Sequence, residues 1–176
     1  KVAKHGNRSV SSKCGSADVL EALGVKIDIP VDKSEKLLEE IGICFLFAPV
    51  YHSSMKYAAP VRRELGVRTI FNILGPLSSP ANASLQLLGV YDESLAEPMA
   101  RVLLNLGVKR AMVVHGHDGL DEVSLSDKTT VCEVKDGKVN KYILDPKEFG
   151  FEYCRPEELV GGDPVANADI ARRILS

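Results

Sequence analysis

The chain has 176 residues, of which 45% are hydrophobic and 26% charged, and its formal net charge is −2 at pH 7. These proportions are those of a globular protein large enough for one hydrophobic core. The pI near 6.1 disfavours a nucleic-acid binder that works through a broad basic face, and no apolar run approaches the length of a membrane span.

Residues 4–18 contain four cations or potential cations, four hydroxyls, one amide and two glycines, and they lead into a short apolar segment. Backbone N–H groups, hydroxyls and cations gathered before a helix are suited to binding an anion. A solvated polar loop before a helix is the alternative. Ser16 and Asp18 favour a helix start and Gly24 a helix end, which predicts a helix over residues 17–23.

Helices and strands are expected to alternate through the next part of the chain. A helix should end at Gly42, and the apolar run 43–48 predicts a strand buried on both faces. Residues 53–65 have a helical pattern that Pro60 should kink or restart. Residues 75–80 predict a rigid irregular loop.

The second half of the chain continues the alternation and adds one hairpin. Asp136-Gly137, between two alternating segments, is the strongest hairpin signal of the sequence. The expected strands are residues 85–90, 110–114, 129–134 and 138–144, and the expected helices are residues 93–106 and 164–175.

This order of elements predicts an α/β fold, with a largely parallel central sheet flanked by helices and an antiparallel hairpin at one side. Ligands of such sheets bind beyond the carboxyl ends of the strands. Polar clusters fall at three such ends, at residues 4–18, 52–56 and 118–122. We therefore expect them to form one composite site.

Asp121 and Glu122 are adjacent carboxylates that follow shortly after a glycine. On an irregular loop they can converge on a hard cation, although a solvated acidic turn is the commoner situation. An anion site beside them favours the cation, because Mg²⁺ is often held by one or two carboxylates together with substrate phosphates.

Several other residues are candidates to line a pocket. Arg62 or Arg63, consecutive on a predicted helix, could clamp a substrate carboxylate through two parallel hydrogen bonds. His5 and His52 could flank a flat substrate, and Pro76 could form a rigid wall. For each of them a structural or solvent-exposed role is the plainer alternative.

Histidines and cysteines give no metal site of their own. His115 and His117 resemble half of a zinc site, but no third ligand follows at a suitable spacing, so we expect no zinc there. The cysteines are isolated, as is typical of reduced cytoplasmic thiols rather than of zinc sites or disulfides. They are Cys14, Cys44, Cys132 and Cys154.

Four motifs follow one another along the chain. They are KHGNRSVSS with GSAD at 4–18, APVRRELG at 59–66, FNILGPL at 71–77 and HGHDGLDE at 115–122. In this order, over residues 1–176, they make the chain resemble the anthranilate phosphoribosyltransferase family of tryptophan biosynthesis. Cys14 stands where serine is common in that family.

The resemblance implies a role for each motif. Phosphoribosyl diphosphate (PRPP) would contact Lys4, His5, Gly6, Asn7, Arg8, Ser9, Val10, Ser11, Ser12 and Ser16. Anthranilate would be held by Asn7 and Arg62, with His5, His52 and Pro76 around its approach. Mg²⁺ would bind Asp121 and Glu122, as two ions when PRPP is present. We expect no general base, because an aromatic amine is already neutral at pH 7.

The implied activity is Mg²⁺-dependent transfer of phosphoribose from PRPP to the amine of anthranilate, with release of diphosphate, by a cytoplasmic homodimer. Residues 1–176 would be most of the large α/β domain, of the kind that nucleoside phosphorylases and phosphoribosyltransferases share. The family implies a helical domain and a glycine-rich loop before residue 1, and further chain after residue 176. Without them we expect weak turnover or none.

Two other functions are compatible with parts of the sequence. Pyrimidine nucleoside phosphorylases have a similar Lys-His-Gly, Ser and Asp pattern, with phosphate as the nucleophile. A non-catalytic relative that binds nucleic acid is the other alternative, and the pI opposes it.

Overall fold

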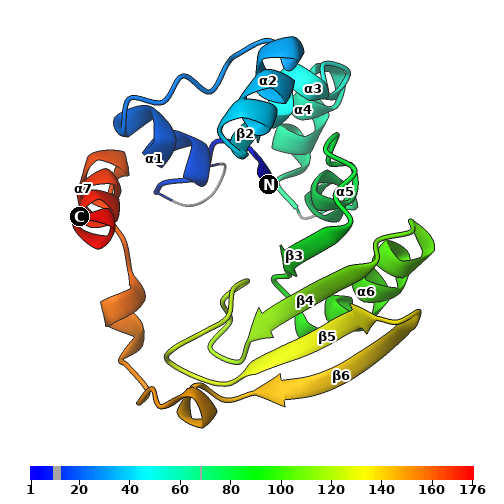
Figure 1. The fold of residues 1–176 in the computed structure, drawn as a ribbon, viewed down its shortest axis with the longest axis vertical. Coiled ribbons are helices and arrows are strands. Elements are labelled where there is room, and N and C mark those ends of the chain that lie inside the picture. Colours follow the sequence, from blue (N-terminus) through cyan, green and yellow to red (C-terminus); the bar gives the residue numbers. More distant parts are fainter. Residues whose placement is uncertain (10–12, 68) are drawn as a thin grey trace. The chain divides into compact units, whose positions relative to one another are not determined.

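The computed structural model describes residues 1–9, 13–67 and 69–176. The chain divides into two compact units, residues 1–81 with 161–176 and residues 82–160 (Figure 1). Each unit contains a sheet with helices packed against it.

The first unit is built on a pair of parallel strands that are joined through helices (Figure 1). The strands are β1 (Val2–Gly6) and β2 (Ile43–Phe47), and the helices between them are α1 (Ser16–Ala22) and α2 (Val31–Glu40). Ala17, Ile27 and Phe47 form a buried cluster, against which Leu20 and Phe45 pack. The apolar face of α1 therefore lies on β2.

Further helices of the first unit follow β2 and close the chain. They are α3 (Ala48–Tyr51), α4 (Met55–Leu65), α5 (Phe71–Leu77) and α7 (Pro164–Leu175). The single turn α3 was not expected; Pro49 is one of its first residues, where a proline favours a helix start. The expected strand over residues 43–48 therefore ends one residue early. Pro60 lies inside α4, which runs without interruption.

The prediction of an irregular loop over residues 75–80 is wrong in its first half, because α5 includes the glycine and the proline of that segment. Asn72 Oδ1 accepts a hydrogen bond from the Thr69 N–H at 2.8 Å. Ser78 Oγ donates to the Leu74 carbonyl at 2.8 Å. Side-chain bonds at both ends thus offset the backbone bond that a proline cannot donate.

The second unit is a four-stranded sheet in the order β3-β4-β5-β6. Its elements are β3 (Leu85–Gly89), η1 (Glu93–Leu95), α6 (Ala96–Asn105), β4 (Arg110–Gly116), β5 (Thr129–Lys135), β6 (Lys138–Leu144), η2 (Pro146–Phe149) and η3 (Pro156–Leu159). The strand β3 is parallel to β4, whereas the other two pairings are antiparallel. The helix α6 packs on β4 and β5, and Leu103 of the helix and the paired Val113 and Cys132 of the strands are at most 1% exposed.

The predicted hairpin is confirmed. Asp136 and Gly137 have φ angles of 51° and 73°, and Lys135 pairs with Lys138 across the turn. Two consecutive residues with positive φ form the two-residue turn that matches the twist of the flanking strands.

The α/β class is confirmed as well. Parallel pairing occurs between β1 and β2 and between β3 and β4, each time across a helical connection. Among the described residues the strands lie in two sheets, so the expected parallel sheet is divided between the units. None of the described helices is long and apolar enough to cross a membrane.

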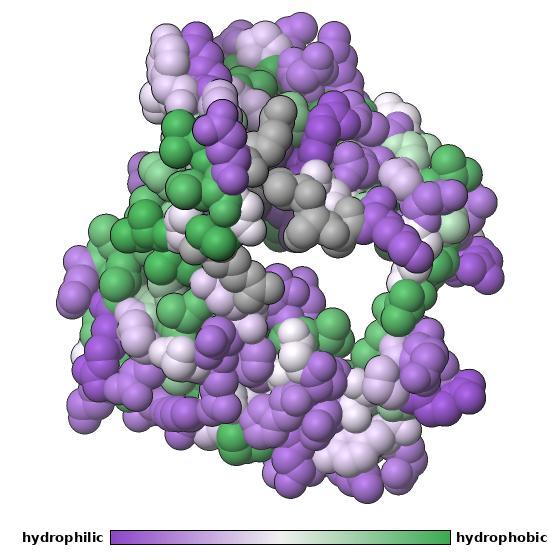
Figure 2. Space-filling view, turned by 180° about the vertical axis from the view of Figure 1, so that it is seen from behind, coloured by the Kyte–Doolittle hydropathy of each residue, from purple (hydrophilic) through white to green (hydrophobic). Residues whose placement is uncertain are grey.

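Apolar side chains also reach the surface (Figure 2). On β3, Leu85 and Leu87 are 65% and 61% exposed, whereas Leu88 is 5% exposed. Because alternate residues of a strand point to opposite faces, the strand buries one face on the core and leaves the other uncovered by the described residues.

Candidate functional site

The polar stretch at the start of the chain forms the connection between β1 and α1. Of the residues predicted to contact PRPP, Lys4, His5 and Gly6 lie on β1, Asn7, Arg8 and Ser9 follow it, and Ser16 begins α1. Val10, Ser11 and Ser12 lie outside the described residues. The stretch therefore occupies the carboxyl end of a parallel strand, as predicted.

Gly6 allows the start of α1 to lie directly against the end of β1. A Cβ atom at this position would stand 3.0 Å from the Phe45 ring and 3.2 Å from Ser16 Oγ. Both contacts are tighter than ordinary packing, so the hydroxyl of Ser16 lies close to the strand end because residue 6 has no side chain.

Asp18 ties the two sides of the opening loop together. Its Oδ2 atom accepts hydrogen bonds from the Ser9 N–H at 3.0 Å and from the Gly15 N–H at 2.8 Å. These two bonds hold the pKa of Asp18 below its usual range. A Cβ atom on Gly15 would lie 2.6 Å from the Ser9 nitrogen, so this close approach requires glycine.

Arg8 is already paired within the first unit. Its guanidinium forms a forked ion pair with Glu21, with Nη2 2.8 Å from Oε1, and Nη1 lies 3.6 Å from Asp18 Oδ1. The same group lies 5.4 Å from the centre of the Phe47 ring. Lys4 is exposed and has no hydrogen-bond or ion-pair partner among the described residues. Lys4 is therefore the more available cation for an anionic ligand.

His5 and His52 meet at the carboxyl ends of β1 and β2. Their Nε2 atoms are 3.1 Å apart and their rings are nearly perpendicular, at 74°. A hydrogen bond between two imidazoles requires one nitrogen to carry the proton and the other to accept it. Burial and then the neighbouring His52 lower the pKa of His5, while a hydrogen bond with the Gly75 backbone acts in the opposite sense.

Two of the five residues predicted to surround anthranilate thus meet, and a third follows a residue whose backbone bonds to one of them. His5 and His52 are in contact, and Pro76 directly follows the glycine whose backbone bonds to His5. Asn7 lies two residues beyond His5, and its Oδ1 atom accepts the backbone N–H of the following residue at 2.8 Å. Arg62 lies on α4, but its side chain is outside the described part of the structure.

The predicted metal ligands belong to the second unit. Asp121 and Glu122 lie in the loop between β4 and β5, are exposed, and have no hydrogen-bond or ion-pair partner among the described residues. Two unpaired adjacent carboxylates fit Mg²⁺, which commonly takes one or two carboxylates and completes its shell with phosphate and water. Nowhere in the described ranges do three or more His, Cys, Asp or Glu residues form a cluster that could hold a metal by themselves.

His115 and His117 have separate hydrogen-bond partners. His115 Nδ1 is 2.8 Å from the Val90 carbonyl oxygen, and His117 Nε2 is 2.9 Å from Thr130 Oγ1. Thr130 in turn donates to Glu93, which also accepts from Lys141 at 2.9 Å. The two histidines therefore contribute to the packing of the sheet.

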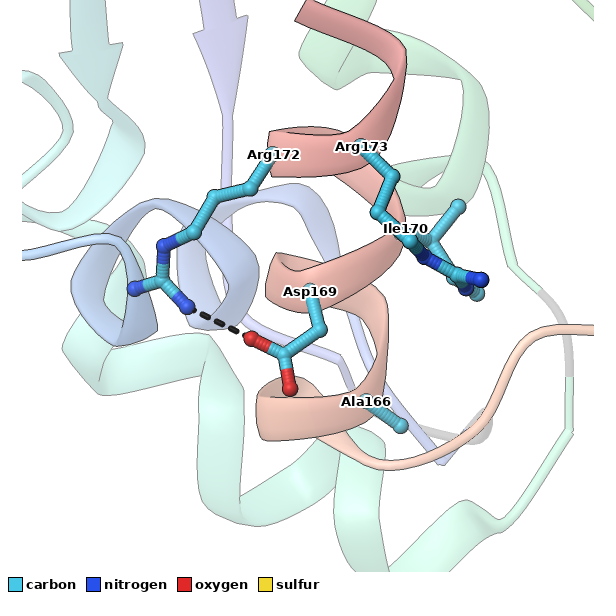
Figure 3. A pocket seen from close by; sticks show the side chains of 5 residues that line it. All are labelled: Ala166, Asp169, Ile170, Arg172 and Arg173. Carbon is cyan, nitrogen blue, oxygen red and sulfur yellow. Dashed lines mark hydrogen bonds and ion pairs between the residues drawn. The ribbon is translucent and has the colours of Figure 1, made fainter. Parts of the chain in front are cut away.

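A surface pocket lies along α7, and none of the predicted site residues lines it (Figure 3). Arg172 is one of its lining residues, and its Nη1 atom lies 2.6 Å from Asp169 Oδ1. Its Nη2 atom donates to the carbonyl of Ala22, the last residue of α1, at 3.2 Å. A cation is favoured at a helix C-terminus, so this bond helps to hold α7 against the end of α1. The pocket therefore lies beside the contact between these two helices.

Sequence reasoning missed two residues that shape the loop of Asp121 and Glu122. Gly89 was only a strand residue in the prediction, and Asp118 was only a member of a polar cluster. Asp118 accepts hydrogen bonds from Ser124 and Ser126. The DG pair at 118–119 indicates a turn, but no sequence signal connects it with serines further along the chain.

The predicted residues are divided between the two units. Those for PRPP and anthranilate lie in the first unit, and those for the metal lie in the second. The expected composite site stays a prediction.

Comparison with known proteins gives a consistent set of relatives. The family model described as glycosyl transferase family, a/b domain, matches residues 1–176. Anthranilate phosphoribosyltransferases of Ruminiclostridium cellulolyticum and Lachnoclostridium phytofermentans are 68% and 65% identical to the chain over 175 residues, 99% of its length. These alignments cover 51% and 52% of those proteins, so the chain spans about half the length of the curated relatives it matches.

Solved structures are similar over the same extent. The anthranilate phosphoribosyltransferase from Thermus thermophilus superimposes with a TM-score of 0.90 and 48% identity, covering 98% of this chain and 51% of that one. The enzyme from Saccharomyces cerevisiae in complex with PRPP and Mg superimposes with a TM-score of 0.87 and 32% identity, covering 99% of this chain and 48% of that one.

Proposed function

The chain belongs to the glycosyl transferase family as its α/β domain, and from this we propose that it forms most of the α/β domain of an anthranilate phosphoribosyltransferase. The reaction transfers phosphoribose from PRPP to the amine of anthranilate, giving N-(5-phosphoribosyl)anthranilate and diphosphate in tryptophan biosynthesis. The relatives that carry this name support the activity.

The observation that carries the proposal is the meeting of His5, His52 and the Gly75 backbone at the carboxyl ends of two parallel strands. Two flat imidazoles near the backbone of Gly75, which Pro76 follows in sequence, suit the approach of a planar aromatic acid. In this proposal Asn7 and Arg62 hold anthranilate, Arg62 through a bidentate pair with its carboxylate, while His5, His52 and Pro76 surround its path.

The opening stretch supplies the PRPP contacts. We assign them to Lys4, His5, Gly6, Asn7, Arg8, Ser9, Val10, Ser11, Ser12 and Ser16. The exposed ammonium of Lys4 and the hydroxyl of Ser16 at the start of α1 support this assignment, because an ammonium and a helix start favour phosphate. Arg8 acts by shaping the loop, given its ion pair with Glu21.

In the mechanism, the bond from ribose C1 to the diphosphate oxygen breaks ahead of the new C1–N bond. Lys4 and the hydroxyl-rich loop stabilise the negative charge that develops on the diphosphate. Arg62 and Asn7 orient the amine towards C1 and so provide proximity. Mg²⁺ on Asp121 and Glu122 would neutralise part of the diphosphate charge. The aromatic amine is a nucleophile at pH 7 without a general base.

The proposal extends to two Mg²⁺ ions with bound PRPP, to a homodimer and to a cytoplasmic location. None of the four cysteines, all of them among the described residues, forms a disulfide, which suits a reducing compartment. The dimer and the second ion are inferred from the family resemblance, as are a helical domain and a glycine-rich loop outside these residues. Residues 1–176 alone should therefore have weak turnover or none.

The test is Arg62→Ala in the full-length enzyme, with the adjacent Arg63→Ala as the matched control. Loss of a charge-assisted pair, about 1.5–3 kcal/mol, should raise the KM for anthranilate about 10- to 100-fold. The KM for PRPP should change far less, and Arg63→Ala should affect neither to that extent. Steady-state kinetics with each substrate varied in turn measure both constants.

Equal effects of Arg62→Ala on both substrates would argue against the carboxylate clamp. Phosphorolysis of uridine or thymidine by the wild-type protein, without phosphoribosyl transfer to anthranilate, would instead support a nucleoside phosphorylase.

A further inference from the structure

We propose that Asp118 is a positioning residue that fixes the loop carrying Asp121 and Glu122 before any metal binds. The inference rests on the proposed function, because it concerns the same pair of carboxylates. It assigns a role to a residue that binds neither substrate nor metal.

Asp118 holds the loop on both sides of the two carboxylates. Its Oδ1 atom accepts a hydrogen bond from the Leu120 N–H at 3.1 Å, just before the pair. Its Oδ2 atom accepts short hydrogen bonds from the hydroxyls of Ser124 and Ser126, just after the pair. A single side chain therefore joins the two ends of the segment that presents Asp121 and Glu122.

The held segment is fixed in turn to the sheet. Ser124 is 1% exposed, and its N–H donates to Oγ1 of the fully buried Thr129 at 3.0 Å, at the first residue of β5. On the other side, the N–H of Gly116, the last residue of β4, donates to the Leu120 carbonyl at 2.8 Å. The loop is thus attached to the adjoining ends of two neighbouring strands.

Two glycines set how closely the loop lies on the sheet. A Cβ atom on Gly89, at the end of β3, would stand 1.7 Å from the Asp121 carbonyl oxygen. One on Gly116 would stand 2.5 Å from Asp118 Oδ1. No other residue type fits at either position without moving the loop, so its backbone rests directly on the carboxyl ends of β3 and β4.

The geometry separates a positioning role from a ligand role. Three donors occupy the oxygens of Asp118, whereas Asp121 and Glu122 have no partner among the described residues. Asp118 is thus committed to the loop, and the two carboxylates that follow it are left for a cation. Groups that orient metal ligands typically change metal affinity about 10- to 100-fold when they are altered, and we expect Asp118 to act at this level.

The experiment uses the full-length enzyme with Asp118→Asn, and Asp127→Asn as its matched control. Asp127 also bears one negative charge in the β4–β5 connection, but its carboxylate accepts from the N–H of the adjacent Lys128 at 2.7 Å. Electron paramagnetic resonance measures the Kd for Mn²⁺ alone. Hydrogen exchange measures the protection of the amides of Leu120 and Ser126, which does not depend on activity.

Asp118→Asn should weaken Mn²⁺ binding about tenfold or more and should speed exchange at both amides. Asp127→Asn should change the Kd less than about twofold, because it removes the same charge but affects only a bond to the adjacent residue and none that joins the two sides of Asp121 and Glu122. Ser126→Ala removes a single donor and should shift both readouts in the same direction by less, so it decides the matter if Asp118→Asn does not fold.

Two results would overturn the inference in distinguishable ways. If Asp118→Asn and Ser126→Ala match Asp127→Asn in both readouts while Asp121→Ala with Glu122→Ala abolishes Mn²⁺ binding, Asp118 has no positioning role and the metal assignment stands. If the double variant binds Mn²⁺ as the wild type does, the metal assignment of the proposed function fails as well.

Discussion

Asp18 and Asp118 each use one carboxylate to close a loop that the proposed function needs. Asp18 accepts hydrogen bonds from the N–H groups of Ser9 and Gly15, which flank residues 10–14. Asp118 accepts hydrogen bonds from Leu120 and Ser124, which flank Asp121 and Glu122. An aspartate is suited to this, because its short side chain brings two acceptor oxygens close to the backbone.

The contact between His5 and His52 makes stability depend on pH. Burial and His52 lower the pKa of His5 in the folded protein below its ordinary value of 6.5. The unfolded chain therefore binds more protons just below pH 6.5. The stabilisation from neutral His5 is complete above that pH and is lost as the pH falls through the folded pKa.

We expect the free energy of unfolding to decrease between about pH 7.5 and pH 5.5, and to decrease less in His5→Gln, which has no imidazole to protonate at this position. Urea unfolding at several pH values measures the difference. If the wild type and His5→Gln lose the same free energy of unfolding across this pH range, protonation of His5 is not the cause of the pH dependence.

At the same scale, sequence reasoning selected His5, His52 and Pro76 together, and the structure brings the histidines into contact. Their roles toward a substrate stay predictions. Sequence reasoning could not predict that Arg8 pairs with Glu21. From the sequence alone, a basic residue in a polar loop could equally bind a phosphate or pair with an acidic residue of the next helix. Such competition depends on how the loop closes.

Elements with a strong periodic or turn signal were predicted well. The last helix, Pro164–Leu175, and the hairpin at Asp136-Gly137 are where the pattern placed them. Segments without such a signal were not. The turn α3 is too short to show a period, and α5 contains a Gly-Pro pair that usually indicates a loop. Side-chain hydrogen bonds at both ends of α5 favour a helix over a loop at this Gly-Pro pair.

The helix α6 offers a direct test of how the second unit is held together. Within α6, the side chain of Leu103 is 1% exposed, whereas that of the neighbouring Val102 is 37% exposed. Leu103→Ala should lower the free energy of unfolding by about 2–5 kcal/mol through lost burial and the cavity left behind. Val102→Ala should change it by less than about 0.5 kcal/mol.

Chemical denaturation of both variants measures these values. A comparable loss in the two proteins would show that α6 does not bury the face described.

On the scale of the whole molecule, the division into two units was not predicted from the sequence. The second unit is continuous, residues 82–160, whereas the first needs both 1–81 and 161–176. The boundaries fall at Ser78-Ser79-Pro80 and at Gly161-Gly162-Asp163-Pro164, but segments this short also occur as ordinary loops within one domain, so the sequence was interpreted as a single domain. The chain returns to the first unit in α7 through tertiary contacts that the sequence does not reveal, such as the hydrogen bond from Arg172 to the Ala22 carbonyl.

This continuity predicts that residues 82–160 fold by themselves. The fragment retains the sheet, α6 and the buried side chains between them, although a domain of this size is only marginally stable. We expect dispersed amide resonances in its ¹H–¹⁵N spectrum and a cooperative thermal transition. Leu103→Ala in the fragment should abolish both. A collapsed spectrum for the unaltered fragment would refute the prediction.

The discontinuity of the first unit also bears on how the protein is made. Domains generally fold as units, N-terminal first, while the chain is synthesised. Here residues 1–81 leave the ribosome first, yet their contacts with α7 can form only after residues 82–160 have been translated. The second unit can therefore be finished while the first still awaits its last helix. The half with the proposed substrate residues is begun first and completed last.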